Sequence, residues 1–363
     1  MDARDYLPLN ASAAPSIEKN HASGRRDRSL VGIWYFQHLT LQQVKSIVTT
    51  LLAFANAIAV LGQGVEDFAF PNKVTKVIDA YPQLSPDGTM ILFQSNRTGN
   101  WDLFVCDRKG GNVRQLTNDT LSEVTPKWSP DGKRIVFCID VDTVNSDIYI
   151  MDADGSNRRQ LTSFAGDDSH PNWSPDGQRI IYNSAQNTPD PNLPWNQQHV
   201  EIFTMNIDGS DKRQLSRLNT VSTYPSFSPD GKSIVFRSVI SEPALNWDLS
   251  ATNRNSEIFI MNADGSNPKN ISKNIGYDGW PAWSRNGEFI LFTSNRIGPA
   301  NIGQLYIVRK DGSTARQLTN GPGSFIQATC GVDQLIYAYQ HSETEDDGRI
   351  VSFKLNSFTA VVK

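Results

Sequence analysis

The chain has 363 residues, of which 38% are hydrophobic and 20% are charged, and it contains 25 glycines and 19 prolines. This apolar content is enough for a sizeable core, while the many turn residues exclude a helical bundle, a collagen, a coiled coil and a wholly disordered chain. The net charge of −4 provides no basic field for a phosphate backbone or an anionic lipid surface. We therefore expect no nucleic-acid partner.

The first part of the chain, residues 1–64, is expected to be a disordered or mis-annotated leader. Its segment 44–61 resembles a signal peptide, because the run from Ile47 to Leu61 is uncharged, is too short to span a bilayer and contains Ala57-Ile58-Ala59, a small-x-small cleavage site. If translation began at Val44, read as an alternative start codon, the product would open as a secretory signal. An N-terminal anchor or an amphipathic helix is the alternative. The signal predicts a periplasmic or secreted protein without a membrane span in its mature form.

A heptapeptide repeat decides the fold of residues 65–363. It reads Pro-x-x-Ser-Pro-Asp-Gly in four copies and Pro-Ala-Trp-Ser-Arg-Asn-Gly in the fifth, at intervals of roughly 45 to 55 residues. Ser-Pro-Asp-Gly favours a type I turn between two antiparallel strands, and a later Asp-Gly pair predicts a second hairpin in each unit. Four short strands per unit of this length are typical of a β-propeller blade. The serines of the five copies are Ser85, Ser129, Ser174, Ser228 and Ser284.

The sequence therefore predicts an all-β protein, a six-bladed β-propeller of four-stranded antiparallel blades. After Thr319, three strand-like runs without the turn motif form a degenerate sixth blade. Its outermost strand comes either from residues 359–362 or from residues 66–78, and closure protects the first and last sheet edges. The aromatic residue of each repeat should pack between blades, as part of the core rather than of a cofactor site. Its positions are 128, 173, 227 and 283.

The strand order places the function on one rim of the propeller. The loops that join the second strand to the third, and one blade to the next, share a rim that carries two insertions, residues 184–199 and 241–254. Loops of this length in a compact repeat are usually functional. Residues just before each repeat proline should open onto the same rim, beside the central channel. Thr125 and Thr223 are among these residues.

Together these positions predict an acidic mouth walled with aromatic residues. Such a mouth suits a sugar ring, and equally a peptide with a basic or aromatic anchor. If the protein is an enzyme, the expected acid, base or cation ligands are Asp168, His170, Glu123 and Asp278. The complete set of expected ligand-binding residues is Asp79, Tyr81, Glu123, Asp168, His170, Tyr224, Asp278, Trp280, Trp195, His199 and Trp247.

Several other motifs point to structure rather than to chemistry. Cys106, Cys138 and Cys330 form no metal-ligand or disulfide pattern and are expected to be buried apolar residues. Arg97 and Arg296 occupy equivalent places in two repeats, which favours a duplicated structural ion pair over catalysis. No motif of a serine hydrolase, a nucleotide hydrolase or a zinc protease is present. We expect no metal or other cofactor, with a divalent cation such as Ca²⁺ in the central channel as the alternative.

The repeated Trp-Ser-Pro-Asp-Gly, followed by Ile-Tyr-Ile-Met-Asp-Ala-Asp-Gly-Ser and Arg-Gln-Leu-Thr, resembles the WD-like propeller repeat of TolB, the periplasmic propeller of the Tol-Pal envelope system. The resemblance covers about residues 80–320. Oligogalacturonate-lyase-like enzymes and the propellers of prolyl-oligopeptidase-like peptidases carry the same repeat. Because only residues 60–80 are available before the repeats, we expect neither the α/β domain that precedes the TolB propeller nor a peptidase domain. The sequence also has few of the histidines on which the lyase metal site relies.

The resemblance implies a TolB-like propeller that recognises a ligand without catalysis. The expected partner is an envelope or extracellular protein, a peptide or an oligosaccharide, and the expected oligomeric state is a monomer. The alternative is a carbohydrate-active enzyme, such as an oligogalacturonate-lyase-like polysaccharide lyase acting at the propeller mouth.

Overall fold

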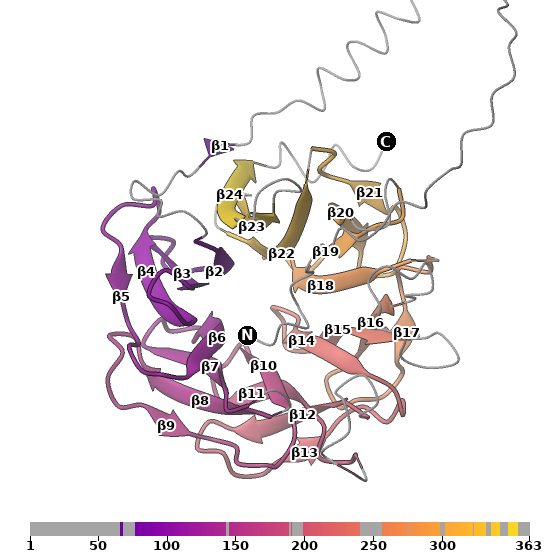
Figure 1. Ribbon diagram of the computed structural model, residues 1–363. Helices are drawn as coiled ribbons and strands as arrows, with labels where there is room; N and C mark the ends of the chain where they lie inside the picture. Colours follow the sequence, from indigo (N-terminus) through magenta and orange to yellow (C-terminus); the bar gives the residue numbers. More distant parts are fainter. Residues whose placement is uncertain are drawn as a thin grey trace, which may run out of the picture. The chain divides into compact units, whose positions relative to one another are not determined.

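The described residues form a closed ring of six sheets around a central axis (Figure 1). The computed structural model describes residues 66–67, 77–142, 145–188, 190, 199–239, 256–274, 276–297, 302–321, 323–331, 335–341 and 348–354. Each sheet has four antiparallel strands, so the predicted six-bladed β-propeller is confirmed. Within these residues, no helix is long and apolar enough to cross a membrane.

Five blades run in chain order from a long inner strand to a two-residue outer strand. Blade 1 comprises β2 (Asp79–Leu84), β3 (Met90–Ser95), β4 (Asp102–Asp107) and β5 (Arg114–Gln115), and blade 2 comprises β6 (Ser122–Trp128), β7 (Arg134–Asp140), β8 (Ser146–Asp152) and β9 (Arg159–Gln160). Blade 3 comprises β10 (Asp168–Trp173), β11 (Arg179–Ser184), β12 (Glu201–Asn206) and β13 (Arg213–Gln214), and blade 4 comprises β14 (Ser222–Phe227), β15 (Ser233–Val239), β16 (Ser256–Asn262) and β17 (Lys269–Asn270). Blade 5 comprises β18 (Asp278–Trp283), β19 (Phe289–Ser294), β20 (Gln304–Arg309) and β21 (Arg316–Gln317).

The sixth blade is built from both parts of the chain and closes the ring. It contains β22 (Ser324–Cys330), β23 (Leu335–His341) and β24 (Gly348–Lys354), and its outer strand is β1 (Glu66–Asp67). Glu66 pairs with Ser352 in antiparallel register. Of the two expected closing segments, 66–78 therefore supplies the strand, while residues 359–362 and the leader 1–64 lie outside the described residues.

The repeat serine fixes the turn between the first two strands of a blade. In blade 1 the Gly88 amide donates to the Ser85 carbonyl at 2.9 Å, as a type I turn requires. The Ser85 hydroxyl donates to Asp87 Oδ1 at 2.6 Å and accepts the Met90 amide at 2.9 Å. The same hydroxyl contact recurs at Ser129, Ser174, Ser228 and Ser284.

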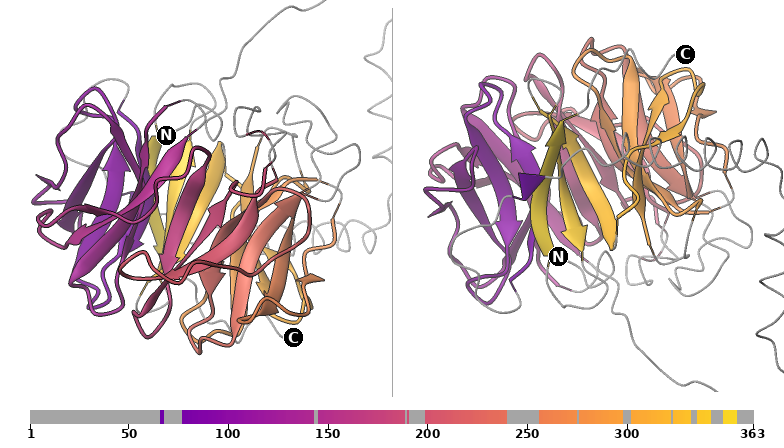
Figure 2. Two further views of the ribbon diagram at one scale, coloured as in Figure 1. Left: turned by 90° about the horizontal axis from the view of Figure 1, so that it is seen from below. Right: turned by 90° about the horizontal axis from the view of Figure 1, so that it is seen from above.

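Aromatic residues of the repeat pack between neighbouring blades, as expected. The indole nitrogen of Trp173 in blade 3 donates to the Lys127 carbonyl of blade 2 at 3.1 Å, and Trp283 of blade 5 donates to the Ser226 carbonyl of blade 4 at 3.1 Å. Both indoles are buried, and they join the apolar residues of the middle strands in clusters that cross the blade boundaries. Figure 2 shows the blades edge-on, packed face to face. Cys106 and Cys138 are buried as expected, whereas Cys330 at the end of β22 is only half-buried, and none of the three forms a disulfide.

The outer strands are held by contacts with the Asp-Gly turn of the next blade. Arg159 donates to the carbonyls of Ile207 and Asp208, both at 2.9 Å, and Lys269 donates to the Asp311 carbonyl at 2.9 Å. The glycine of such a turn approaches the preceding blade closely. A Cβ added at Gly265, whose φ is +88°, would lie 2.2 Å from the Leu215 carbonyl oxygen.

We expect the Gly265→Ala variant to be destabilised by about 3 kcal/mol, because the left-handed backbone disfavours a side chain and the Leu215 carbonyl would have to move. Gly99→Ala is the matched control, since Gly99 also has positive φ but nothing within 4 Å of the added carbon. Urea unfolding of both variants provides the measurement. Equal losses of stability would contradict a steric role for the inter-blade approach.

Candidate functional site

Each of the six inner strands holds one non-glycine residue in the left-handed conformation. Their φ values lie between 49° and 56°, and five of the six residues precede a proline. Such backbone costs of order 1–3 kcal/mol per residue and is concentrated at ligand clamps and other functional sites. The six residues are Tyr81, Thr125, His170, Tyr224, Trp280 and Gln327.

A β-bulge at each of these positions turns the side chain toward the central channel. In blade 1 the register with β3 shifts between Ala80 and Gln83, and equivalent shifts occur in the other five inner strands. Polar contacts between blades hold the bulged backbone. The Tyr81 amide donates to Gln327 Oε1 at 3.1 Å, and the Thr125 amide donates to Gln94 Oε1 at 2.7 Å.

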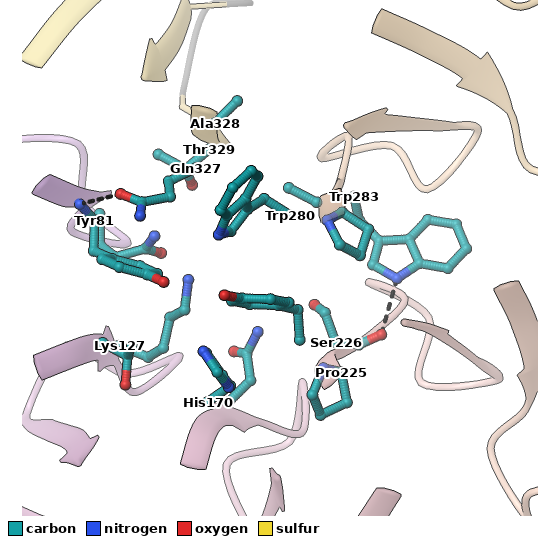
Figure 3. A pocket seen from close by; sticks show the side chains of 16 residues that line it. Tyr81, Lys127, His170, Pro225, Ser226, Trp280, Trp283, Gln327, Ala328 and Thr329 are labelled. Atoms are coloured by element: carbon teal, nitrogen blue, oxygen red, sulfur yellow. Dashed lines mark hydrogen bonds between the residues drawn. The ribbon is translucent and has the colours of Figure 1, made fainter. Parts of the chain in front are cut away.

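The six residues line a pocket of about 220 Å³ in the channel (Figure 3). A second ring of side chains, two positions further along each inner strand, completes the wall. Pro225, Pro281, Trp283 and Ala328 also contribute to the lining. The members of the second ring are Gln83, Lys127, Asn172, Ser226, Ala282 and Thr329.

Aromatic rings form one continuous side of this pocket. The ring centroids of His170 and Tyr224 lie 3.9 Å apart, and those of Tyr224 and Trp280 lie 5.9 Å apart. Behind them the buried Arg237 places its guanidinium carbon 5.2 Å from the Tyr224 ring centroid and donates to the Tyr277 hydroxyl at 3.0 Å. This support fixes the orientation of the aromatic wall.

A hydrogen-bond relay sets the tautomer of His170. The Ser169 hydroxyl donates to Asp167 Oδ2 at 2.7 Å and accepts from Asn183 Nδ2 at 2.8 Å. Asn183 Oδ1 then lies 2.9 Å from His170 Nδ1. Because that amide oxygen can only accept, neutral His170 carries its proton on Nδ1 and its lone pair on Nε2.

Lys127 is the one Lys or Arg side chain among the described lining residues of the pocket. It is half-buried, and the removal of water around the ammonium lowers its pKa to about 8. None of the described lining residues is acidic. The pocket therefore places a positive charge beside aromatic faces, with no carboxylate in its wall.

The structure places the expected carboxylates away from this pocket, so the described residues do not form the expected acidic mouth. Asp79 and Asp278 are buried in ion pairs with Arg97 at 2.7 Å and Arg296 at 2.8 Å, which confirms the structural role expected for the two arginines. In a regular strand, Asp79 would share a face with Tyr81. The left-handed residue breaks that alternation and sends only the aromatic side chain into the channel.

Glu123 and Asp168 are likewise buried and outside the pocket lining. Burial is the main cause that raises the pKa of Glu123 to about 8. The neighbouring Asp119 also raises this pKa, and its effect is larger than the lowering by Arg158, whose guanidinium lies 3.1 Å from the Glu123 carboxylate. Burial also raises the pKa of Asp168 to about 7. At neutral pH both positions therefore favour the protonated acid more than an exposed carboxyl would.

The insertion residues divide between described and undescribed segments. Trp195 and Trp247 lie outside the described residues. His199 is exposed and does not line the pocket. Its backbone amide donates to Thr188 Oγ1 at 2.9 Å. Tyr81, His170, Tyr224 and Trp280 are the expected ligand-binding residues that the structure brings together. Sequence reasoning missed Lys127, although alternation along the inner strand after the proline indicates that position.

The site does not fit a resident divalent cation. Within the described ranges, no group of three or more His, Cys, Asp or Glu residues could hold a metal ion. The channel wall there places an ammonium group beside aromatic rings and holds no carboxylate, whereas a Ca²⁺ site usually includes Asp or Glu carboxylates together with carbonyl oxygens.

Comparisons with known proteins agree with this fold. The family model described as the TolB beta propeller domain matches residues 120–190. Protein TolB homolog of Chlorobium chlorochromatii (strain CaD3) is 28% identical over 149 residues, which are 41% of this chain and 31% of that protein. The matched segment thus spans less than one third of the curated relative's length.

Two solved structures share the arrangement of the blades. TolB from Acinetobacter baumannii matches with a TM-score of 0.55 at 20% identity, over 70% of this chain and 56% of that one. An oligogalacturonate lyase in complex with manganese matches with a TM-score of 0.51 at 12% identity, over 79% and 92% of the two chains. The fold and the repeat define a six-bladed β-propeller with the Ser-Pro-Asp-Gly turn in its first four blades. Within that class, the fold is similar to the TolB propeller, and residues 120–190 match the model of that domain.

We expect the stability of the protein to fall as pH rises from about 5 to 8, in part through Glu123. Its folded-state pKa of about 8 lies above the value of 4.5 for an exposed Glu, so the folded protein holds a proton that the unfolded chain has lost. The contribution is complete below pH 4.5 and is lost as pH rises through 8. Thermal unfolding of Glu123→Gln should show a shallower fall over this range and a higher Tm than wild type at pH 8.

The exposed Glu288 provides the control for this measurement. Glu288→Gln removes the same formal charge and should leave the pH dependence unchanged. An unaltered slope in the Glu123→Gln variant would show that Glu123 does not bind the extra proton.

Proposed function

We propose that this protein is a non-catalytic binding propeller, which holds a peptide segment of an envelope or extracellular partner protein in its central channel. The observation that carries the proposal is the ring of six left-handed residues, which directs Tyr81, His170, Tyr224 and Trp280 into one pocket. Ligand sites commonly combine apolar walls with a few placed polar groups, and aromatic anchors dominate the energetics of such contacts.

The distribution of carboxyl groups also supports binding over catalysis. The acids expected to act as catalytic groups, Glu123, Asp168 and Asp278, are buried outside the pocket, and Asp278 is neutralised by Arg296. The TolB-like fold agrees with a recognition role, and the signal-like segment 44–61 supports export to the periplasm or the medium.

A second candidate is a lyase that acts on an acidic oligosaccharide. The relay from Asp167 through Ser169 and Asn183 favours it, because it leaves the lone pair of neutral His170 on Nε2, as a general base requires. The pocket would then have to admit a sugar chain and not only a side chain.

To test the binding function, the full-length protein is used to select binders from a random peptide library displayed on phage. We expect the enriched peptides to lose at least about 10-fold in affinity for the Trp280→Ala variant, because an aromatic ring that lines the pocket is removed. Trp128→Ala is the matched control, since Trp128 is half-buried but does not line the pocket.

The alternative is tested in parallel by incubating the full-length protein with acidic and neutral oligosaccharides and analysing the products by mass. Cleavage that is lost in His170→Ala would replace the binding proposal with the lyase. A library that enriches no peptide dependent on Trp280 would also count against the binding function.

A further inference from the structure

Three hydrogen-bond donors of the pocket have no acceptor among the described residues. The ammonium of Lys127 makes no ion pair, hydrogen bond or ring contact there. The indole Nε1 of Trp280 and the amide Nε2 of Gln327 are buried without a hydrogen-bond partner. The three donors come from blades 2, 5 and 6, and Figure 3 shows the Lys127 side chain and the Trp280 nitrogen directed into the pocket.

These donors are costly unless something accepts from them. A buried polar group without a partner has lost its hydrogen bonds to water, and a cation that lacks a counter-charge loses still more hydration energy. Gln327 is only 5% exposed, and its oxygen is already fixed by the Tyr81 amide at 3.1 Å. The amide nitrogen is therefore held in place and cannot turn away to find water.

The chemistry that matches this arrangement is a single carboxylate. A carboxylate has four lone-pair sites and can accept from an ammonium, an indole and an amide at once. The wall holds one lysine and no arginine among its described residues, which suits one negative charge rather than the two of a phosphate. The volume of about 220 Å³ is below the range of about 300–1,000 Å³ typical of whole small-molecule ligands, so it suits one side chain or one chain end.

We propose that the channel pocket recognises a carboxylate of an acidic peptide segment, bound by the donors of Lys127, Trp280 and Gln327 between the aromatic rings of Tyr81 and Tyr224. The inference rests on the proposed function and names the chemistry of its ligand. The carboxylate comes either from an aspartate or glutamate side chain or from the C-terminus of the bound segment. In both cases the bound peptide supplies the counter-charge that the pocket wall lacks.

Three peptides test this inference with the full-length protein. The first is the blocked pentapeptide acetyl-Gly-Phe-Glu-Phe-Gly-amide, the second carries Gln in place of Glu, and the third carries Gln together with a free C-terminal carboxylate. Calorimetric titration measures their affinities. The indole N–H resonance of Trp280, assigned from the Trp280→Phe variant, reports whether the ligand reaches the pocket.

We expect the Glu peptide, the free-carboxylate peptide or both to bind at least about 10-fold more tightly than the neutral peptide and to shift the Trp280 resonance. The peptide that gains affinity identifies the source of the carboxylate. Lys127→Met should remove this gain, and Lys127→Arg should retain part of it. Lys133→Met is the matched control, because Lys133 is exposed on the adjoining turn and lies outside the pocket.

Equal affinities of the charged and neutral peptides, or no binding by any of the three, would overturn the inference. A gain that survives in a folded Lys127→Met protein, checked by its thermal unfolding, would do the same. Binding of digalacturonate that depends on Lys127, without binding of any of the peptides, would also overturn the inference. The proposed function would still stand if library peptides depended on Trp280 without any preference for acidic residues.

Discussion

One left-handed residue in each inner strand is the constraint on which the site depends. A regular strand alternates its side chains between two faces, and in a propeller both faces of an inner strand meet neighbouring blades. The bulge at Tyr81 and the five equivalent bulges break this alternation. One side chain of each inner strand then points into the channel, while the neighbouring residues stay packed in the core. The same feature keeps Asp79 and Asp278 out of the pocket and buried, where Arg97 and Arg296 neutralise them.

The propeller separates stability from recognition along each inner strand. The turn after the strand is built from Ser-Pro-Asp-Gly contacts, and the aromatic residue before that turn ties two blades together, as Trp173 does. The serine contact of this turn recurs in blades 1 to 5. The residues at the left-handed positions are all different, apart from two tyrosines, so the repeat frame carries a non-repetitive pocket. Diversity confined to such positions lets one fold present different chemistry.

The sequence was enough to predict the six blades, their four strands and the inter-blade tryptophans, because turn chemistry and period act locally. It also indicated the pre-proline positions, and Tyr81, His170, Tyr224 and Trp280 do meet in one pocket. It could not place Asp168 or Glu123, since alternation alone does not show a bulge. The sequence also did not predict that Gln327 lines the pocket, because the sixth blade lacks the repeat motif and its strand register depends on distant residues.

The pairing of β1 with β24 has a consequence for how the chain folds during synthesis. Five blades consist of strands that follow one another closely, and each can form soon after it leaves the ribosome. The sixth blade must bring Glu66 to Ser352, and this pairing closes a loop that contains nearly the whole propeller, so its entropic cost is larger than that of a pairing within one blade. The ring therefore stays open, with an exposed strand edge, until β24 has been synthesised. Because Gln327 belongs to the sixth blade, the pocket is complete only when that blade has formed.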